Sequence, residues 1–340
     1  MKGMDPLTHG LLGASIGQAI CGRALGRRAL VWGAVLGMAP DLDILARPLG
    51  PLADWIWHRG PTHGLWVGPL VGPLLGYGLW RRKGGALRAW IGLAVVSLLS
   101  HPLLDLCITY GTQLLAPFSN RRFALDAVAI IDPAYSLTLA AGLAVGLGAG
   151  LAGSRSRRAG WAALTISSLY LGLGLWVNGR AEAIARAQLA AKEVAAWDVT
   201  AYPTLLQLPY RRIVARSGDD VRIGWLSVIR PRPIEWEGFT QARGPLVEAA
   251  RSSPEARVFE WFAMGEATPR VERASDGSIV EFDDLRYGLP GAPRDGFWGV
   301  RVRLDADARP LGPGERFDRD LPAPVSKLLR TLWRETLGLS

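Results

Sequence analysis

The chain has 340 residues, of which 49% are hydrophobic, and a formal net charge of +9 at neutral pH. Such a charge is compatible with nucleic-acid binding, but the basic residues gather in short loops between apolar runs, which argues against that class of function. The two cysteines, Cys21 and Cys107, exclude a disulfide framework, and we expect both to be buried thiols. The composition changes near residue 178 from apolar to polar, which predicts at least two domains.

The N-terminus lacks the features of a targeting segment. Lys2 is the only early cation, and the first apolar stretch continues into arginine-rich sequence, unlike a cleaved signal peptide. A lipoprotein anchor at Cys21 would need a small preceding residue, where Ile20 stands. We therefore expect the first helix, with His9, to remain in the protein.

Apolar segments dominate the first half of the chain. Four runs approach or reach the length that crosses a hydrocarbon core: 64–80, 86–106, 129–153 and 160–177. Two shorter helices, 6–22 and 27–39, precede them and form either two short spans or a re-entrant pair. The predicted fold class is therefore mainly α, a polytopic membrane bundle of about six helices over residues 1–178.

The positions of the basic residues predict how this bundle is oriented. Three clusters lie between the apolar runs and are expected to face the cytoplasm: Arg23, Arg27 and Arg28; Arg81, Arg82 and Lys83; and Arg155, Arg157 and Arg158. Threading the chain through these clusters brings the His and Asp residues of the first half to the opposite, outer ends of their helices. These residues are His9, Asp41, Asp43, His58, His63, His101 and Asp105.

The polar second half is expected on the same, extracytoplasmic side. Residues 179–198 form a predicted connecting helix, and residues 199–340 a small β-rich domain without histidine or a recognisable catalytic motif. Its predicted strands are 210–216, 221–229, 257–262, 270–273, 278–282 and 297–304, with a hairpin turn at Asp276 and Gly277. The pattern of residues 325–337 predicts a closing amphipathic helix.

All four histidines lie in the first third of the chain, near carboxylates, and this pattern points to a metal site. His101 and Asp105 are four residues apart and share one face of a predicted helix, a spacing that suits a common metal ion. The same pair could be a structural hydrogen bond, but ionisable groups in an apolar span are costly and usually functional.

Three further segments supply candidate ligands. His58 and His63 flank a tight turn at Gly60 and Pro61, where the alternative interpretation is an interfacial loop with polar tips. Asp41 and Asp43 follow a helix end in a predicted extended stretch, with both carboxylates on one side or, alternatively, in a solvated loop. His9 begins the first helix, for which Asp5 is a candidate N-cap. These three segments thus contribute Asp5, His9, Asp41, Asp43, His58 and His63 to the set of residues considered for the site.

In this order, the motifs resemble the bacterial membrane-bound metal-dependent hydrolases of the LexA-regulated inner-membrane type. The resemblance covers roughly residues 4–180 and rests on these segments: residues 5–9, Pro40-Asp41-Leu42-Asp43, His58-Arg59-Gly60-Pro61-Thr62-His63, His101-Pro102-Leu103-Leu104-Asp105, and Thr109-Tyr110-Gly111-Thr112 with Pro117. That family is distantly similar to zinc-dependent phospholipases C and single-strand nucleases, which implies metal-dependent phosphoester hydrolysis. This chain has fewer histidines than the secreted members, so a three-zinc site is not expected.

The predicted function is hydrolysis of a phosphoester in a lipid or lipid-linked substrate by metal-activated water at the bacterial inner membrane. The expected metal ligands are His9, Asp41, Asp43, His58, His63, His101 and Asp105, around about two ions of zinc, with manganese or iron as alternatives. Asp41, Asp43, Arg59, Arg121 and Arg122 are the expected catalytic residues. The arginines would hold phosphate oxygens or, alternatively, lipid headgroups. An ester or amide hydrolase and a non-enzymatic metal-stabilised scaffold remain alternatives.

Overall fold

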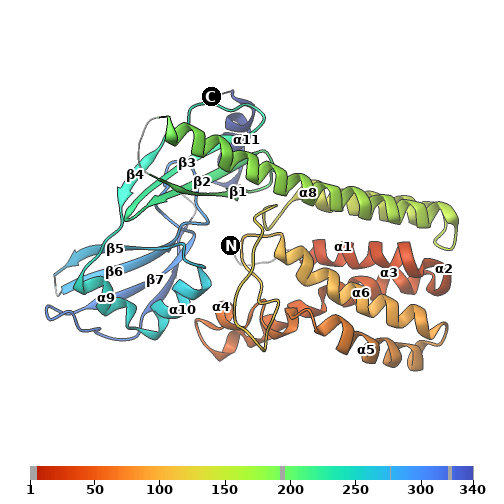
Figure 1. Ribbon diagram of the computed structural model, residues 1–340. Helices are drawn as coiled ribbons and strands as arrows, with labels where there is room; N and C mark the ends of the chain where they lie inside the picture. The colour runs from red at the N-terminus through yellow and green to blue at the C-terminus, as the bar shows by residue number, and fades with distance from the viewer. Residues whose placement is uncertain (1–5, 192–195, 276, 321–323, 340) are drawn as a thin grey trace. The chain divides into compact units, whose positions relative to one another are not determined.

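The computed structural model describes residues 6–191, 196–275, 277–320 and 324–339 (Figure 1). Asp5, the candidate N-cap, lies outside these residues. The described chain divides into two compact units. A helical unit comprises the residues up to Ala46 and Trp57–Leu175, and a second unit comprises Arg47–Ile56 together with the residues from Trp176 onward. The predicted order, a helical membrane region followed by a β domain, is confirmed.

The helical unit begins with a closely packed helix pair, drawn red in Figure 1. Its elements are α1 (Pro6–Ile16), a π-helical turn (Gly17–Cys21), α2 (Gly22–Leu25), α3 (Arg27–Met38) and the 3₁₀ helix Ala39–Leu49. Glycines bring α1 and α3 into backbone contact, because a Cβ atom on Gly13 would lie 2.0 Å from the Gly33 carbonyl oxygen. Small residues at such a crossing are typical of membrane helices.

The rest of the unit surrounds α6, whose inward face is fully buried. The elements are the 3₁₀ turn Pro61–His63, α5 (Val67–Lys83), α6 (Leu87–Leu106) and α7 (Pro133–Gly148). Trp90 and Leu93 of α6 are completely buried in a core shared with α1, α3 and α7. Both cysteines are buried free thiols, as predicted. Helix α7 begins at Pro133, four residues later than predicted, because the Asp132 carboxylate accepts hydrogen bonds from the amides of Ala134 and Tyr135.

Three described helical segments are long and apolar enough to cross a membrane: Arg27–Leu49, Leu87–Leu106 and Ser154–Ala190. Helix α7 is a shorter apolar helix. The prediction of a separate connecting helix at 179–198 after the apolar run 160–177 is wrong, since α8 (Ser154–Ala190) runs without a break from the helical unit into the second unit. Residues 192–195 of the predicted helix lie outside the described residues. Its polar last turns bear Ala181, Ala185 and Leu189 on one buried face, which pack on a β-sheet of the second unit.

Two antiparallel four-stranded sheets form most of the second unit. The first contains β1 (Asp198–Pro203), β2 (Tyr210–Ser217), β3 (Asp220–Ser227) and β4 (Glu237–Thr240) in that order. The second contains β5 (Ala267–Ala274), β6 (Gly277–Asp284), β7 (Trp298–Leu304) and β8 (Glu315–Asp318). Besides the end of α8, the described residues of this unit include most of α4 (Ala53–Trp57) and the helices α9 (Pro245–Arg251), α10 (Pro254–Phe262) and α11 (Val325–Leu337). The predicted hairpin of β5 and β6 and the closing helix are confirmed.

The strand predicted at 257–262 is wrong, because these residues belong to helix α10. Ser253 caps this helix through its hydroxyl, which accepts a hydrogen bond from the Ala256 amide, and Pro254 occupies the first turn. Phe259 and Phe262 are both fully buried. Their helical spacing places both rings against Trp55, at centroid distances of 5.0 and 5.4 Å. Trp55 belongs to Arg47–Ile56, so this short segment is part of the core of the second unit.

Candidate metal centre

The candidate ligands come from the ends of four helices of the helical unit. His9 lies in the first turn of α1, Asp41 and Asp43 follow α3, His63 precedes α5, and His101 and Asp105 lie in the last turns of α6. The stretch with the two aspartates is a 3₁₀ helix, so the predicted extended conformation is wrong. The structure nevertheless brings these side chains together. His63, His101 and Asp105 are almost completely buried.

Two imidazoles and two carboxylates converge at the centre of the cluster. The Nε2 atoms of His63 and His101 are 2.9 Å apart. Asp105 Oδ2 lies 3.2 Å from the first and 3.4 Å from the second. Asp41 Oδ1 lies 3.7 Å and 3.3 Å from the same two nitrogens. Four potential ligand atoms therefore face one point from three separate segments.

The outer nitrogens of both rings are held in ways that leave Nε2 available. His101 Nδ1 lies 2.6 Å from the carbonyl oxygen of Gly37, which can only accept a hydrogen bond, so Nδ1 is the donor and Nε2 is the nitrogen that faces the cluster. His63 Nδ1 lies 3.2 Å from Asp43 Oδ2. A carbonyl or carboxylate behind a histidine is the usual support of a metal-ligating imidazole.

Asp43 also organises the loop that carries His58. Its Oδ1 lies 2.7 Å from His58 Nδ1, and its Oδ2 accepts hydrogen bonds from the Arg59 amide at 2.9 Å and the Thr62 hydroxyl at 3.2 Å. Both carboxylate oxygens are thus occupied by the loop 58–63. The structure therefore favours an orienting role for Asp43, while Asp41 faces the paired imidazoles directly.

His9 and Arg59 complete the cluster around Asp105. His9 Nε2 and Arg59 Nη2 lie 3.2 and 3.0 Å from Asp105 Oδ1, and the His9 ring stacks on that of His101 at 3.7 Å between centroids. Arg59 is 1% exposed and has a positive φ of 57°. A left-handed backbone is costly for an arginine and is typical of functional sites.

The charge of the cluster fits a cation. Burial lowers the pKa of His63, but the facing carboxylates of Asp105, Asp41 and Asp43 outweigh burial and raise this pKa to about 10. Within the described part of the chain, the oxygens of Asp41 and Asp105 lack a hydrogen bond of normal geometry. Buried carboxylate oxygens of this kind require a positively charged partner. Either protonated histidines or a bound metal ion can supply that positive charge.

Among the residues that the structure describes, three overlapping groups could each hold a metal ion, with ligand atoms within 4.8 Å of one another. The groups are His9, His101 and Asp105; Asp41, His63 and His101; and Asp41, Asp43 and His58. Mixed imidazole and carboxylate donors suit divalent transition metals. Because neighbouring groups share His101 or Asp41, the residues fit a small cluster better than isolated sites.

The other two arginines expected in the site have different surroundings. Arg122 is buried and donates hydrogen bonds to the carbonyl oxygens of Gly111 and His58, at 2.7 and 3.0 Å. Arg122 therefore supports the His58 loop. Arg121 is exposed and lies over the ring of Phe123. Tyr110 belongs to the segment Thr109-Tyr110-Gly111-Thr112 that carries the family resemblance, but the sequence predicts no role for it. Its ring contacts Arg59, Arg122 and His58.

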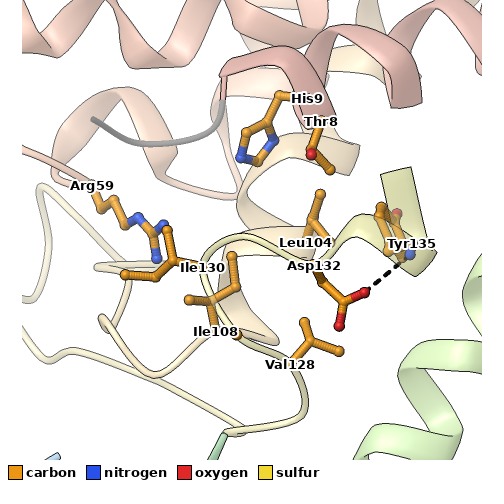
Figure 2. A pocket seen from close by; sticks show the side chains of 10 residues that line it. Thr8, His9, Arg59, Leu104, Ile108, Val128, Ile130, Asp132 and Tyr135 are labelled. Carbon is orange, nitrogen blue, oxygen red and sulfur yellow. Dashed lines mark hydrogen bonds between the residues drawn. The ribbon is translucent and has the colours of Figure 1, made fainter. Parts of the chain in front are cut away.

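A small cavity of about 20 Å³ adjoins the cluster (Figure 2). This volume is enough for about one water molecule. Its lining combines polar side chains with apolar ones. The polar ones are Thr8, His9, Arg59, Asp132 and Tyr135, and the apolar ones are Leu104, Ile108, Val128, Ala129 and Ile130. The site thus has both charged and lipid-like surroundings within one pocket.

The orienting role of Asp43 predicts a specific result. Asp43→Asn keeps the size of the side chain but removes the charge that supports His63 and His58, so metal affinity should fall about 10- to 100-fold. Competition with a fluorescent chelator measures this affinity. Asp54→Asn, in the partly exposed Arg47–Asp54 ion pair, is the control and should leave the affinity unchanged. Equal affinity in Asp43→Asn and the parent would contradict the role.

Comparison with known proteins gives one match. The sequence profile of the YdjM inner membrane protein family matches residues 4–181. This stretch contains every candidate ligand, the candidate membrane spans Arg27–Leu49 and Leu87–Leu106, and most of the span Ser154–Ala190. Searches of curated proteins and of solved structures found no match. Since the matched region covers just over half of the chain, the protein belongs to the YdjM inner membrane protein family.

Proposed function

We propose that this protein is a membrane-bound metal-dependent hydrolase that cleaves a phosphoester of a lipid or lipid-linked substrate. The observation that carries the proposal is the convergence of His63, His101, Asp41 and Asp105, with the Nε2 atoms 2.9 Å apart and a buried arginine on Asp105. If these ion pairs served only to stabilise the fold, two imidazole nitrogens that face each other would add little to stability. A shared metal ion explains their arrangement better.

Zinc is the expected metal, with manganese or iron as alternatives, and two ions are proposed because the ligand groups overlap. His9, Asp41, His58, His63, His101 and Asp105 would hold them, with Asp43 behind two of the imidazoles. Bound there, divalent ions would supply Lewis acidity toward a phosphoryl oxygen and make water nucleophilic at neutral pH.

The chain's own residues would bind the phosphate and accept the proton. Arg59 has its guanidinium at the cavity and would bind a phosphate oxygen with its planar fork. The side chain of Asp41 is 14% exposed, against 6% for Asp43 and 0% for Asp105. Asp41 is therefore the carboxylate most accessible from outside the cluster, and we assign it the proton of the attacking water.

A lipid substrate is supported by the apolar surroundings of the site. Leu42, between the two aspartates, is 62% exposed, and Leu45 and Phe118 are also highly exposed. Exposed apolar side chains beside an ionic cluster suit the boundary between headgroups and acyl chains. The arginine clusters lie at the opposite ends of α3 and α5, and by the positive-inside rule this arrangement supports an extracytoplasmic position for the proposed metal centre.

Purified protein loaded with zinc or manganese tests the proposal. In mixed micelles, it should release a phosphorylated or dephosphorylated product from at least one phospholipid or polyprenyl phosphate, and a chelator should stop this release. A metal-loaded protein that cleaves carboxylic esters or amides instead would support the alternative hydrolase. A single, fully ligated ion and no hydrolysis of any class would support a metal-stabilised scaffold.

Arg59→Lys separates phosphate binding from metal binding. Lysine keeps a positive charge beside Asp105 but lacks the planar guanidinium that binds two phosphate oxygens. We therefore expect kcat/KM to fall by about tenfold or more while the metal content stays unchanged. Steady-state kinetics and elemental analysis measure the two quantities. Arg88→Lys, at the exposed start of α6, is the matched control. Unchanged kinetics in Arg59→Lys would remove this residue from the proposed mechanism.

A further inference from the structure

A second, much larger cleft lies in the β-containing unit and has no part in the proposed hydrolysis. Its volume is about 820 Å³, within the range of small-molecule binding sites. Its walls are the ends of β2 and β3, the segment 230–237, the loop 290–293 and one face of α11. All of these elements belong to the same compact unit.

Three aromatic side chains, Tyr210, Trp225 and Trp236, line the cleft. Trp225 pairs across the sheet with Arg212, whose Cζ atom lies 5.1 Å from the centroid of the ring. Arg212 is fully buried and donates hydrogen bonds to the carbonyl oxygens of Leu285 and Pro293. The Trp225 ring and the loop at Pro293 are thus held by one buried guanidinium, which makes this wall rigid.

The opposite wall is also fixed before any ligand binds. Gln188 of α8 accepts a hydrogen bond from the Ile234 amide and donates one to the Arg232 carbonyl oxygen. Arg232 in turn donates to the Gly338 carbonyl oxygen at 2.7 Å, and Ser227 to that of Thr336. These bonds connect the segment 230–237 and α11 to the rest of the unit. A preformed cleft loses little conformational entropy on binding.

The charges around the cleft discriminate between classes of ligand. Two arginines and three glutamates line it: Arg230, Arg232, Glu235, Glu237 and Glu335. A phosphate or nucleotide site would concentrate cations, and a lipid site would be apolar throughout. Burial and the carboxylates of Glu335 and Glu235 raise the pKa of Tyr210, so its phenol stays a hydrogen-bond donor. The aromatic side chains of the cleft are therefore surrounded by hydrogen-bond donors and acceptors and by charges of both signs.

We propose that this cleft binds an oligosaccharide. Aromatic rings pack against the apolar faces of pyranose rings, while arginine and glutamate side chains satisfy hydroxyl groups that both donate and accept hydrogen bonds. The volume of the cleft lies in the range of pockets that bury drug-sized ligands, which suits a short oligosaccharide. The site would give the protein a glycan-binding surface separate from its metal centre, and it does not depend on the hydrolase assignment.

The test uses full-length protein in a detergent without a sugar headgroup, titrated calorimetrically with chitotetraose, cellotetraose and maltotetraose. At least one should bind saturably with a Kd of about 1 mM or tighter. Trp236→Ala should weaken that binding about threefold to tenfold, and the exposed Glu235→Ala about tenfold. Trp333→Ala, an exposed tryptophan on α11 that does not line the cleft, should have no effect.

Two outcomes would overturn the proposal. One is the absence of binding by all three glycans at concentrations up to about 10 mM. The other is binding that both cleft variants leave unchanged, while thermal unfolding shows them to be folded. A zwitterionic tetrapeptide serves as the competing ligand. If it binds in a Trp236-dependent way where the glycans do not, the cleft is a peptide site.

Discussion

His101→Ala should remove metal from the protein and abolish hydrolysis. This imidazole takes part in two of the three groups that could hold an ion, and its Nδ1 is oriented by the Gly37 carbonyl oxygen. Loss of an orienting partner alone typically costs 10- to 100-fold in metal affinity or activity, so loss of a shared ligand should cost more than about 100-fold. Elemental analysis and the lipid phosphoester assay measure the two effects.

The neighbouring residue Ser100 supplies the matched control. Its hydroxyl donates to the Ser97 carbonyl oxygen within α6 and lies outside the metal cluster, so Ser100→Ala should keep both metal and activity. Circular dichroism and thermal unfolding must show His101→Ala to be folded for the comparison to count. A folded His101→Ala protein that retained stoichiometric metal would contradict the proposed centre.

Gly33→Ala should disrupt the packing of the first helix pair. A Cβ atom at this position would lie 2.2 Å from the Gly13 carbonyl oxygen, a distance that no side-chain rotation can relieve. Forcing extra volume into a packed interface costs about 1–3 kcal/mol, and here the obstacle is backbone. Because α3 leads directly into Asp41 and α1 carries His9, metal content should fall together with stability.

Gly92→Ala in α6 provides the opposite expectation within the same unit. A Cβ atom there meets nothing within 4 Å, so alanine should be neutral or stabilising by up to about 1 kcal/mol through its higher helix propensity. Thermal unfolding in detergent compares the two variants. If Gly33→Ala and Gly92→Ala had equal unfolding temperatures, the close approach of α1 and α3 would not contribute to stability.

The cluster of histidines and aspartates could be anticipated from the sequence because ionisable residues are costly in apolar helices and their spacing is informative. His101 and Asp105 share a helix face, and the order of basic and apolar segments brings helix ends together. The supports of the ligands could not be anticipated in the same way. The Gly37 carbonyl oxygen beside His101 is a backbone atom of a kind that every residue has, so no sequence pattern marks it. The hydrogen bond from Arg122 to the His58 carbonyl oxygen joins residues that only the folded chain brings together.

The errors in secondary structure have similar physical causes. Residues 257–262 have the alternating composition of a strand, but the Ser253 cap and Pro254 start a helix whose aromatic face is buried. The polarity change near residue 178 suggested a helix boundary, whereas α8 continues through it because its small residues pack on the first sheet. Local pattern was outweighed by tertiary packing in both places.

The placement of Trp55 has a consequence for biosynthesis. This residue precedes His58 by three positions, yet its ring partners Phe259 and Phe262 are translated about 200 residues later. At bacterial or eukaryotic rates of about 5–20 residues per second, the ribosome needs roughly 10–40 s to add them. The stretch between Asp43 and His58 therefore stays without its final partners until about three quarters of the chain has been made. A nascent or truncated protein would carry the candidate metal ligands before it could fix the segment that joins them.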